Sequence, residues 1–228
     1  MARARAREAD ALAVWLAGVT GDDRPAVCVS MVVAESRFPH RDVAIEPALS
    51  VVEVAQAVDE GRERAAQAAS DGATVIANRA NAEPVVASLC LIAALTGRDV
   101  GFVHDSPTRA ACERALARHP DAARGPLHAL RRLGSGDIAV LCGVALGAGE
   151  RGLAYLCADL ASTVAAAVAT AIEPGLRPRL LAAAPSAEPA HRALLETLAL
   201  TPVLDAPTEG DATTAALSRL RLACTDRS

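Results

Sequence analysis

Three carboxylates stand close together in the last part of the chain, at Asp205, Glu209 and Asp211. Glu209 is followed by Gly210, which can adopt the backbone conformations that tight turns require. A Glu in a partly apolar pocket has a pKa raised from about 4.3 and can act as a general base. The alternative for this segment is ordinary capping of the next helix by Asp211, because a carboxylate is favoured at a helix N-terminus.

A second polar segment, Pro185–His191, also follows an expected strand. Ser186 is a good N-cap and Pro189 lies within the first turn, so a well-capped helix is the favoured interpretation. Glu188 adds a carboxylate to the same loop. Ser186 and His191 do not indicate a nucleophile–base pair, because neither a third partner nor a nucleophile elbow is visible.

The segment Thr74–Val85 is typical of a strand, a loop and a helix start, which is the arrangement that binds phosphate groups. Its chemistry is less suited to that task, because no Gly lies between Ala77 and Pro84 and Glu83 would repel an anion at the helix N-terminus. The polar side chains that remain to contact a ligand there are Asn78, Arg79 and Asn81.

The amino-acid composition argues against several classes of function. The net charge of −4, the absence of Lys and an aromatic content of 2% argue against a nucleic-acid partner and against Lys-based chemistry. The histidines show no metal-ligand spacing, so we expect neither a metal nor another cofactor. Six cysteines without a CxxC pair, each in an apolar run typical of buried side chains, predict a reducing, cytoplasmic setting. No apolar run reaches membrane-spanning length.

Apolar runs alternate with amphipathic segments along the chain. This alternation predicts βαβ units and an α/β fold of three layers, with a mostly parallel, Rossmann-like sheet flanked by helices and a small helical appendage. Ser50 with Glu53 has the pattern of a capping box at the start of a long helix, and Asp137 can cap the helix that follows it. The expected strands are 27–33, 74–77, 100–103, 153–157, 180–184 and 202–204, and the expected helices are 2–18, 50–70, 84–95, 107–118, 127–133, 138–148, 162–172, 187–198 and 213–224.

In such a sheet, ligands bind beyond the carboxyl ends of the strands. The loops that should gather at this edge are 78–83, 104–106, 185–188 and 205–211. The chain shows no internal repeat or low-complexity linker, so we expect one domain.

Four segments in this order resemble motifs of the nicotinate-nucleotide:dimethylbenzimidazole phosphoribosyltransferase family. They correspond to Gly-Pro-Ala-Met-Ser/Thr, Leu-Gly-Gly-x-Glu-Ile-Ala, Ser-x-Glu-Pro-Gly-His and Glu-Gly-Thr/Ser-Gly-Ala, and here they occupy residues 46–50, 133–139, 186–191 and 209–212. The resemblance covers residues 45–222, whereas residues 1–44 are expected to be a divergent, shortened N-terminal part.

The resemblance implies transfer of phosphoribose from nicotinate mononucleotide to a benzimidazole-type base, as in synthesis of the lower ligand of cobalamin. Glu209 would then be the general base. Substrate contacts would come from Asn78, Arg79, Asn81, Ser186, Glu188, Gly210 and Asp211. The resemblance also implies a dimer, either a homodimer or a heterodimer with a related subunit.

The resemblance fails at the phosphate loop. The family's Gly-Glu-Met-Gly-Ile-Gly-Asn-Thr-Thr motif corresponds to residues 77–85, where almost none of its residues are present. The family's phosphate-contacting Lys has no Lys counterpart in this sequence, and the nearest cationic residue is Arg109. Two alternatives therefore stand beside the transferase hypothesis. One is a non-catalytic homologue that acts as a small-base binding module or partner subunit, and the other is altered N-glycoside chemistry.

Overall fold

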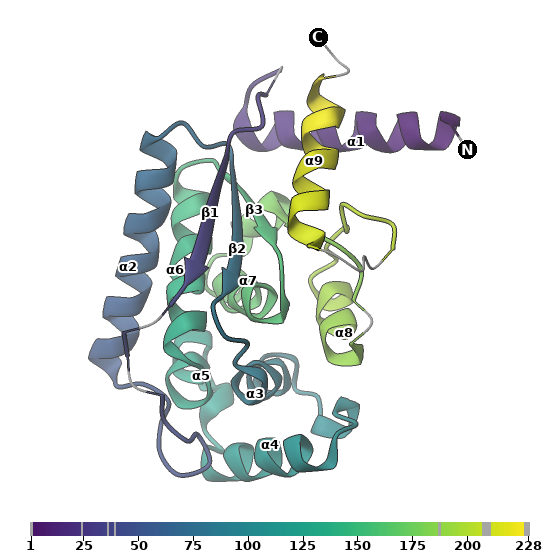
Figure 1. Cartoon of the computed structure of the whole chain (residues 1–228). Coiled ribbons are helices and arrows are strands. Elements are labelled where there is room, and N and C mark those ends of the chain that lie inside the picture. The colour runs from purple at the N-terminus through teal and green to yellow at the C-terminus, as the bar shows by residue number, and fades with distance from the viewer. Residues whose placement is uncertain are drawn as a thin grey trace.

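The computed structural model describes residues 2–23, 25–35, 37–38, 40–186, 188–206 and 211–225, with side chains from residue 11 onward. Four strands form one sheet in the order β1 (Val29–Ala34), β2 (Val75–Ala80), β3 (Ala154–Cys157) and β4 (Leu180–Ala182). All neighbouring strands are parallel, so their carboxyl ends lie at one edge (Figure 1). The expected α/β fold with a parallel sheet is confirmed.

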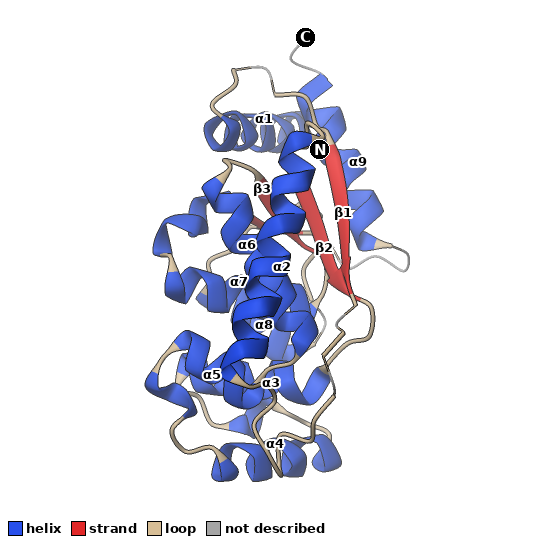
Figure 2. Ribbon diagram, turned by 90° about the vertical axis from the view of Figure 1, so that its left-hand side faces the viewer, coloured by secondary structure: helices blue, strands red, loops and turns tan. Residues whose placement is uncertain are grey.

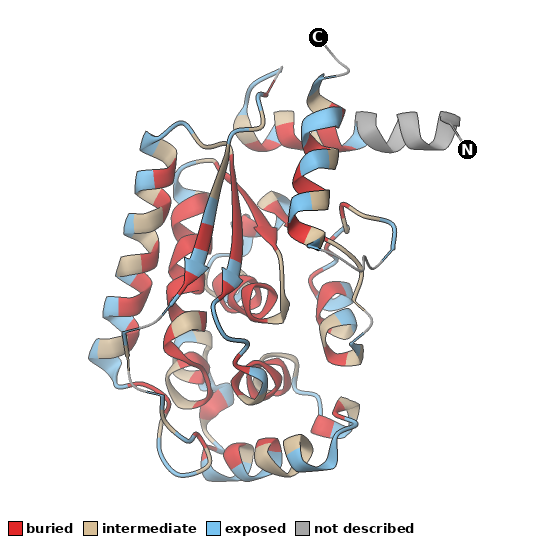
Figure 3. Ribbon diagram, in the orientation of Figure 1, coloured by how far each residue is buried: buried red, intermediate tan, exposed pale blue. Residues whose placement is uncertain are grey.

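Helices cover both faces of the sheet. Helices α1 (Ala2–Thr20) and α9 (Ala212–Thr225) pack on one face through a cluster that includes Leu16, Leu156 and Leu220. The other face carries α2 (Val51–Ser70), α6 (Gly136–Glu150) and α7 (Leu160–Ile172). Figure 3 shows buried residues on the strands and on the helix sides turned toward them. This arrangement gives three layers.

A helical appendage lies beyond the carboxyl ends of β1 and β2 (Figures 1 and 2). It consists of α3 (Val85–Thr96), α4 (Ser106–Arg118) and α5 (Pro126–Leu133), joined by the short 3-10 helices η1 (Val100–Phe102) and η2 (Ala122–Arg124). The remaining elements, η3 (Pro174–Arg179) and α8 (Pro189–Thr197), lie beside α7. The appendage therefore sits against the edge at which parallel sheets bind ligands.

Two expected strands are wrong. Val100–Phe102 is a 3-10 helix, because the Asp99 side chain accepts a hydrogen bond from the Gly101 N–H and the Val103 N–H bonds back to the Val100 carbonyl at 2.9 Å. The segment 202–204 is not a regular strand, and its pairing is a single parallel bridge between Ala182 and Pro202. The Val203 N–H donates to the Ala182 carbonyl at 2.8 Å and the Leu204 N–H donates to the Ala183 carbonyl at 3.1 Å, so the segment lies beside β4 without forming a regular strand.

Helices α2 and α6 approach closely at two glycines. A Cβ atom at Gly61 would lie 2.0 Å from the Val140 carbonyl oxygen, and one at Gly143 would lie 2.1 Å from the Val58 carbonyl oxygen. Only glycine lets the two backbones meet at that distance. The predicted capping box at the start of α2 is confirmed, with Ser50 and Glu53 each bonded to the other's backbone N–H.

The cysteines are free thiols, as expected from the absence of CxxC pairs. Cys90, Cys112, Cys142 and Cys157 are buried, but Cys28 is exposed and Cys224 is half-buried, so the expectation that every Cys fills the core is wrong at these two positions. Among the described helices, none combines the length and the apolar character that crossing a bilayer requires.

Candidate functional site

The carboxyl edge of the sheet is held together by Asp159, which follows β3. Its Oδ1 accepts a hydrogen bond from the Ser162 N–H at 2.7 Å, and its Oδ2 accepts one from the Ala80 N–H of β2 at 2.9 Å. Ser162 reciprocates by accepting the Asp159 N–H at 3.0 Å, which completes a capping box on α7. One carboxylate thus closes the start of α7 and ties it to the end of β2.

Glu83 lies in the loop between β2 and α3, just before the N-cap residue Pro84. Its carboxyl accepts a hydrogen bond from the Ser88 hydroxyl at 3.4 Å and another from the backbone N–H of Ala161 in the first turn of α7. Partial burial of the carboxyl, together with the nearby negative charge of Asp159, raises the pKa of Glu83 to about 7. A group that titrates near neutrality at the binding edge of such a sheet marks a candidate functional site.

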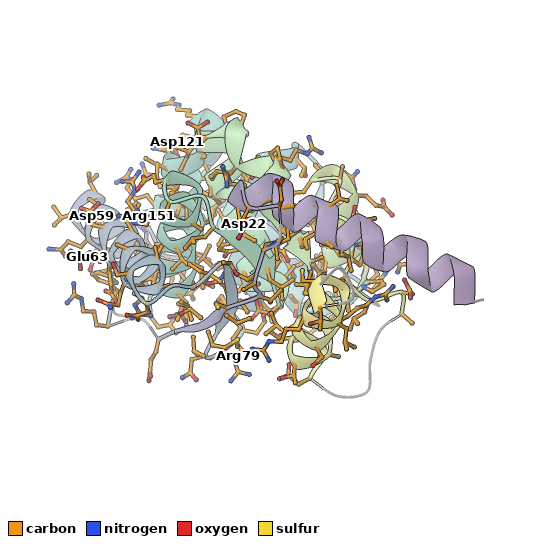
Figure 4. The ribbon with its side chains drawn as sticks, turned by 90° about the horizontal axis from the view of Figure 1, so that it is seen from above. Asp22, Asp59, Glu63, Arg79, Asp121 and Arg151 are labelled. Atoms are coloured by element: carbon orange, nitrogen blue, oxygen red, sulfur yellow. The ribbon has the colours of Figure 1, made fainter. Side chains whose placement is uncertain are left out.

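Asn78 lies near the end of β2 and is fully buried. Its Nδ2 donates to the Ile76 carbonyl at 3.0 Å, but its Oδ1 has no hydrogen-bond partner among the described residues. A buried acceptor without a donor costs free energy, so this oxygen is suited to receive a hydroxyl or N–H from a ligand. The neighbouring Arg79 is exposed, and in Figure 4 it lies on the opposite side of the molecule from Asp121.

A small cavity of about 190 Å³ opens beside the ends of β1 and β2. Asn81 lines it together with the loop 134–137 that precedes α6, and with Glu35, His40 and Arg41. In that loop Ser135 is the N-cap, because its hydroxyl accepts the Ile138 N–H at 3.2 Å. The expectation that Asp137 caps this helix is therefore wrong, and Asp137 lies in the first turn instead.

His191 on α8 contacts the same edge through the buried Thr163. Its Nε2 lies 2.9 Å from the Thr163 hydroxyl, which in turn donates to the Asp159 carbonyl at 2.8 Å. Burial lowers the pKa of His191, so the neutral imidazole is favoured at neutral pH. If the Thr163 hydroxyl directs its proton to Asp159, Nε2 of His191 carries the ring proton and Nδ1 is left as an acceptor.

The polar segment before α8 is arranged differently from the prediction. Glu188, not Ser186, is the N-cap of α8, and its carboxylate accepts the His191 N–H. Ser186 instead accepts the Glu188 N–H at 3.1 Å. The longer Glu side chain reaches the first turn from a position closer to the helix, which explains the exchange of roles. The sequence prediction of a capped helix with Pro189 in its first turn is confirmed.

The C-terminal carboxylates are described in part. Asp211 accepts hydrogen bonds from the Thr213 N–H at 3.0 Å and the Thr214 hydroxyl at 2.7 Å, and these bonds lower its pKa. Asp211 therefore caps the start of α9, which confirms the alternative prediction that Asp211 is a helix cap. Asp205 forms an ion pair with Arg219 at 2.8 Å. Glu209 and Gly210 lie outside the described residues.

Asp159 and Thr163 were not predicted from the sequence as residues of the carboxyl edge. The signal was present as Asp159-x-x-Ser162, which has the spacing of a capping box, but the helix was expected to begin two residues later. The Nε of Arg109 donates to the Val103 carbonyl at 2.7 Å, which orients the guanidinium without neutralising its charge. Within the described residues, no three His, Cys, Asp or Glu side chains are grouped as a metal site would require.

The fold and the edge define a class: an α/β protein whose polar groups gather where parallel strands end, beside the N-termini of α3, α6 and α7. A family model described as phosphoribosyltransferase matches residues 5–225. The chain belongs to this phosphoribosyltransferase family, and the family predicted from the motifs is confirmed.

Named relatives and solved structures support the same family. The nicotinate-nucleotide–dimethylbenzimidazole phosphoribosyltransferase of Azotobacter vinelandii is 37% identical over 192 residues, which are 78% of this chain and 54% of the relative. Its namesake in Pseudomonas aeruginosa is 36% identical over 195 residues, 78% of this chain and 55% of the relative. The chain thus spans about half the length of the curated relatives it matches.

Two crystal structures from Thermus thermophilus share the fold. One, of a nicotinate-nucleotide–dimethylbenzimidazole phosphoribosyltransferase, has a TM-score of 0.81 and 26% identity, with 95% of this chain and 88% of that chain covered. The other, of CobT, has a TM-score of 0.79 and 24% identity, with 98% and 93% covered.

Proposed function

We propose that this protein transfers phosphoribose from nicotinate mononucleotide to a benzimidazole-type base. The observation that carries the proposal is the family match over residues 5–225, in a chain whose polar groups gather at the carboxyl edge of the sheet. In the reaction, a nitrogen of the base attacks the anomeric carbon of the ribose. The bond from that carbon to the nicotinate nitrogen breaks with its electron pair, and a general base removes the proton of the attacking imidazole.

Glu209 is our proposed general base, because it follows the last sheet position and carries the Glu-Gly motif. The described residues on either side support this role. Asp205 is anchored to α9 through Arg219, and Asp211 is anchored through Thr213 and Thr214. Both neighbouring carboxylates are thus engaged in structure, which leaves Glu209 as the carboxylate of the segment for proton transfer.

The remaining contacts are assigned by chemistry. Asn78 offers an unpaired buried oxygen and Asn81 lines the cavity, so we propose that they bind ribose hydroxyls. We propose Arg79 as the cation nearest the strand end and Gly210 and Asp211 as the backbone frame of the base. Ser186 and Glu188 order the start of α8 and with it His191.

We further propose that the protein works in the cytoplasm as a dimer, of two copies or with a related subunit. Two described surface features support association. Val51 and Val52 on α2 are 67% and 63% exposed, and Leu127 on α5 is 46% exposed. Val51 and Leu127 line the same groove between these helices. Sedimentation of the wild-type protein would reveal a monomer if this expectation is wrong.

The transferase proposal is tested by incubating the protein with nicotinate mononucleotide and 5,6-dimethylbenzimidazole and measuring both released nicotinate and the new nucleotide. Glu209→Gln should reduce turnover by at least about a hundredfold, as loss of a general base does, with unchanged nucleotide affinity. Glu63→Gln, an exposed change on α2, is the matched control. Nucleotide binding without turnover in the wild type would support the non-catalytic alternative instead.

A further inference from the structure

Helix α3 begins without a side-chain cap. Pro84 occupies its N-cap position, and no side chain forms a capping hydrogen bond with a backbone N–H there. The first N–H groups of a helix need acceptors, and they carry the positive end of the helix dipole. An uncapped start that directly follows a strand of a parallel sheet is therefore an anion-binding position.

The carboxyl of Glu83 lies beside this position. It is bonded to the Ser88 hydroxyl in the first turns of α3 and to the Ala161 N–H in the first turn of α7. The two donors belong to different helices that follow neighbouring strands, so Glu83 connects two helix starts. These are the kinds of donor that a phosphate group uses at a helix N-terminus.

A second observation indicates that a ligand belongs at this edge. Asn78 is 0% exposed, yet its Oδ1 lacks a partner among the described residues. Asn78 lies on the face of β2 that carries Ile76 and Ala80, the face covered by α6 and α7. Ala80, two residues further along this face, is the residue whose N–H binds Asp159, and Asp159 is the charged neighbour of Glu83. A sugar hydroxyl would satisfy the unpaired oxygen of Asn78.

The charged groups around Glu83 come from several elements. Asp159, between β3 and α7, is its nearest negative neighbour, and His191 on α8 faces Asp159 across Thr163. Helix α7 carries no charged residue between Leu160 and Ile172. Arg79 is exposed and lies on the opposite face of β2 from Asn78, and Arg109 on α4 is bonded to Val103. The nearest electrostatic neighbour of Glu83 is therefore another carboxylate.

We propose that Glu83 occupies the phosphate position of this chain's own nucleotide site, so that a donor's phosphate group binds only in competition with the Glu83 carboxylate. This inference rests on the proposed function, because it names the residue that decides between phosphorylated and unphosphorylated donors. Protonation of Glu83 removes the competing charge. Because its pKa is raised to about 7, nucleotide affinity should fall as the pH rises through neutrality.

The size of the effect follows from the protonated fraction. If only the protonated form admits phosphate, the wild-type dissociation constant at pH 8.5 should exceed that of Glu83→Gln about thirtyfold, whereas at pH 6 the two should agree within about twofold. Gln keeps the acceptor oxygen but loses the charge. Glu83→Ala frees both donors and should bind the nucleotide at least as tightly as Glu83→Gln.

The experiment is isothermal titration of nicotinate mononucleotide into wild type, Glu83→Gln and Glu83→Ala at pH 6, 7 and 8.5. The same titrations with the unphosphorylated nucleoside, nicotinate riboside, isolate the phosphate contribution. Asp105→Asn is the matched control, because Asp105 is also a carboxylate at a helix start, the N-cap of α4. Its affinity should follow the wild type at every pH.

A gap between wild type and the two Glu83 variants that widens with pH for the nucleotide, and is absent for the nucleoside, is the expected result. Nucleotide binding with the same pH dependence in wild type and variants overturns this inference and leaves the transferase proposal intact. Failure of wild type and all variants to bind the nucleotide at any pH overturns both.

Discussion

Helices α7 and α3 begin at the same edge of the sheet, after the neighbouring strands β3 and β2, yet their starts differ. The start of α7 is closed by Asp159, whose two oxygens bind Ser162 and Ala80. The start of α3 has Pro84 at its N-cap and no side-chain cap. The carboxylate nearest to α3, Glu83, bonds to α7 as well as to its own helix.

The difference separates a structural carboxylate from a functional one. Asp159 caps α7 and also accepts the Ala80 N–H of β2, so this helix start belongs to the frame of the molecule. Glu83 accepts a long hydrogen bond of 3.4 Å from Ser88 and has its pKa raised to about 7, so its charge can change near neutral pH. The two helix starts are thus neighbours in space with different tasks.

The largest expected effect on stability comes from replacing Asp159, which caps the start of α7. Asp159→Ala removes the cap of α7 and leaves the Ala80 N–H without its acceptor. A lost cap costs about 0.5–2 kcal/mol and an unpaired buried donor about 1–3 kcal/mol, so the free energy of unfolding should fall by about 2–4 kcal/mol. Urea denaturation measures it. Asp159→Asn keeps the capping oxygen and should lose less, and equal losses would contradict the capping account.

Thr163→Val tests the contact between α7 and α8. The change keeps the shape of the side chain but removes the hydroxyl that bonds to Asp159 and His191. Leaving buried polar groups unpaired should cost about 1–2 kcal/mol of unfolding free energy. Thr170→Val, which removes a hydroxyl bonded within the same helix to Ala166, is the control and should cost less. A loss of the same size in both variants would mean that His191 gains nothing from Thr163.

The raised pKa of Glu83, beside the start of α3, predicts that the stability of the protein depends on pH. The folded protein raises the pKa of Glu83 from 4.5 to about 7, so it favours the protonated form. The resulting stability is fully present below about pH 4.5 and is lost as the pH rises through 7. Thermal unfolding should show wild type losing stability relative to Glu83→Gln across this window. A constant difference between the two proteins would contradict the raised pKa.

The smallest effect is expected at Ser88. Its buried hydroxyl donates to Glu83 at 3.4 Å, a long hydrogen bond. Ser88→Ala should change the unfolding free energy by no more than about 1 kcal/mol and raise the pKa of Glu83 further, because the bond favours the charged form. Carbon-13 NMR of the labelled Glu carboxyls measures the shift. A lower pKa in Ser88→Ala would show that the hydroxyl does not contact Glu83.

Much of the fold could be predicted from local patterns in the sequence. Ser50 with Glu53 and the alternation of apolar runs predicted the long helix and the parallel sheet, because each pattern states a local preference that the fold retains. The prediction of a strand at Val100–Phe102 was wrong. A short apolar run fits a strand pattern, but Asp99 and Gly101 form local hydrogen bonds that make a turn here. Short apolar runs do not reveal whether a neighbouring strand is available.

The site was harder to predict than the fold. Asn78 was predicted as a ligand contact from its position after a strand. Glu83 was noted only as a carboxylate that would repel an anion, and its contact with Ala161, nearly eighty residues later, was not predicted. Such contacts depend on which strands are neighbours. The link from His191 through Thr163 to Asp159 likewise joins α8 to α7 and has no local signature.

The most direct test of the account is the pKa of Glu83 with and without ligand, followed by carbon-13 NMR of the carboxyl. Linkage requires that a phosphate which excludes the charged carboxylate must raise the pKa of Glu83 when it binds. We expect a pKa of about 7 in the free protein and a higher pKa with saturating nicotinate mononucleotide. A pKa near 4.5 in the free protein, or one that bound nucleotide leaves unchanged, would contradict this expectation.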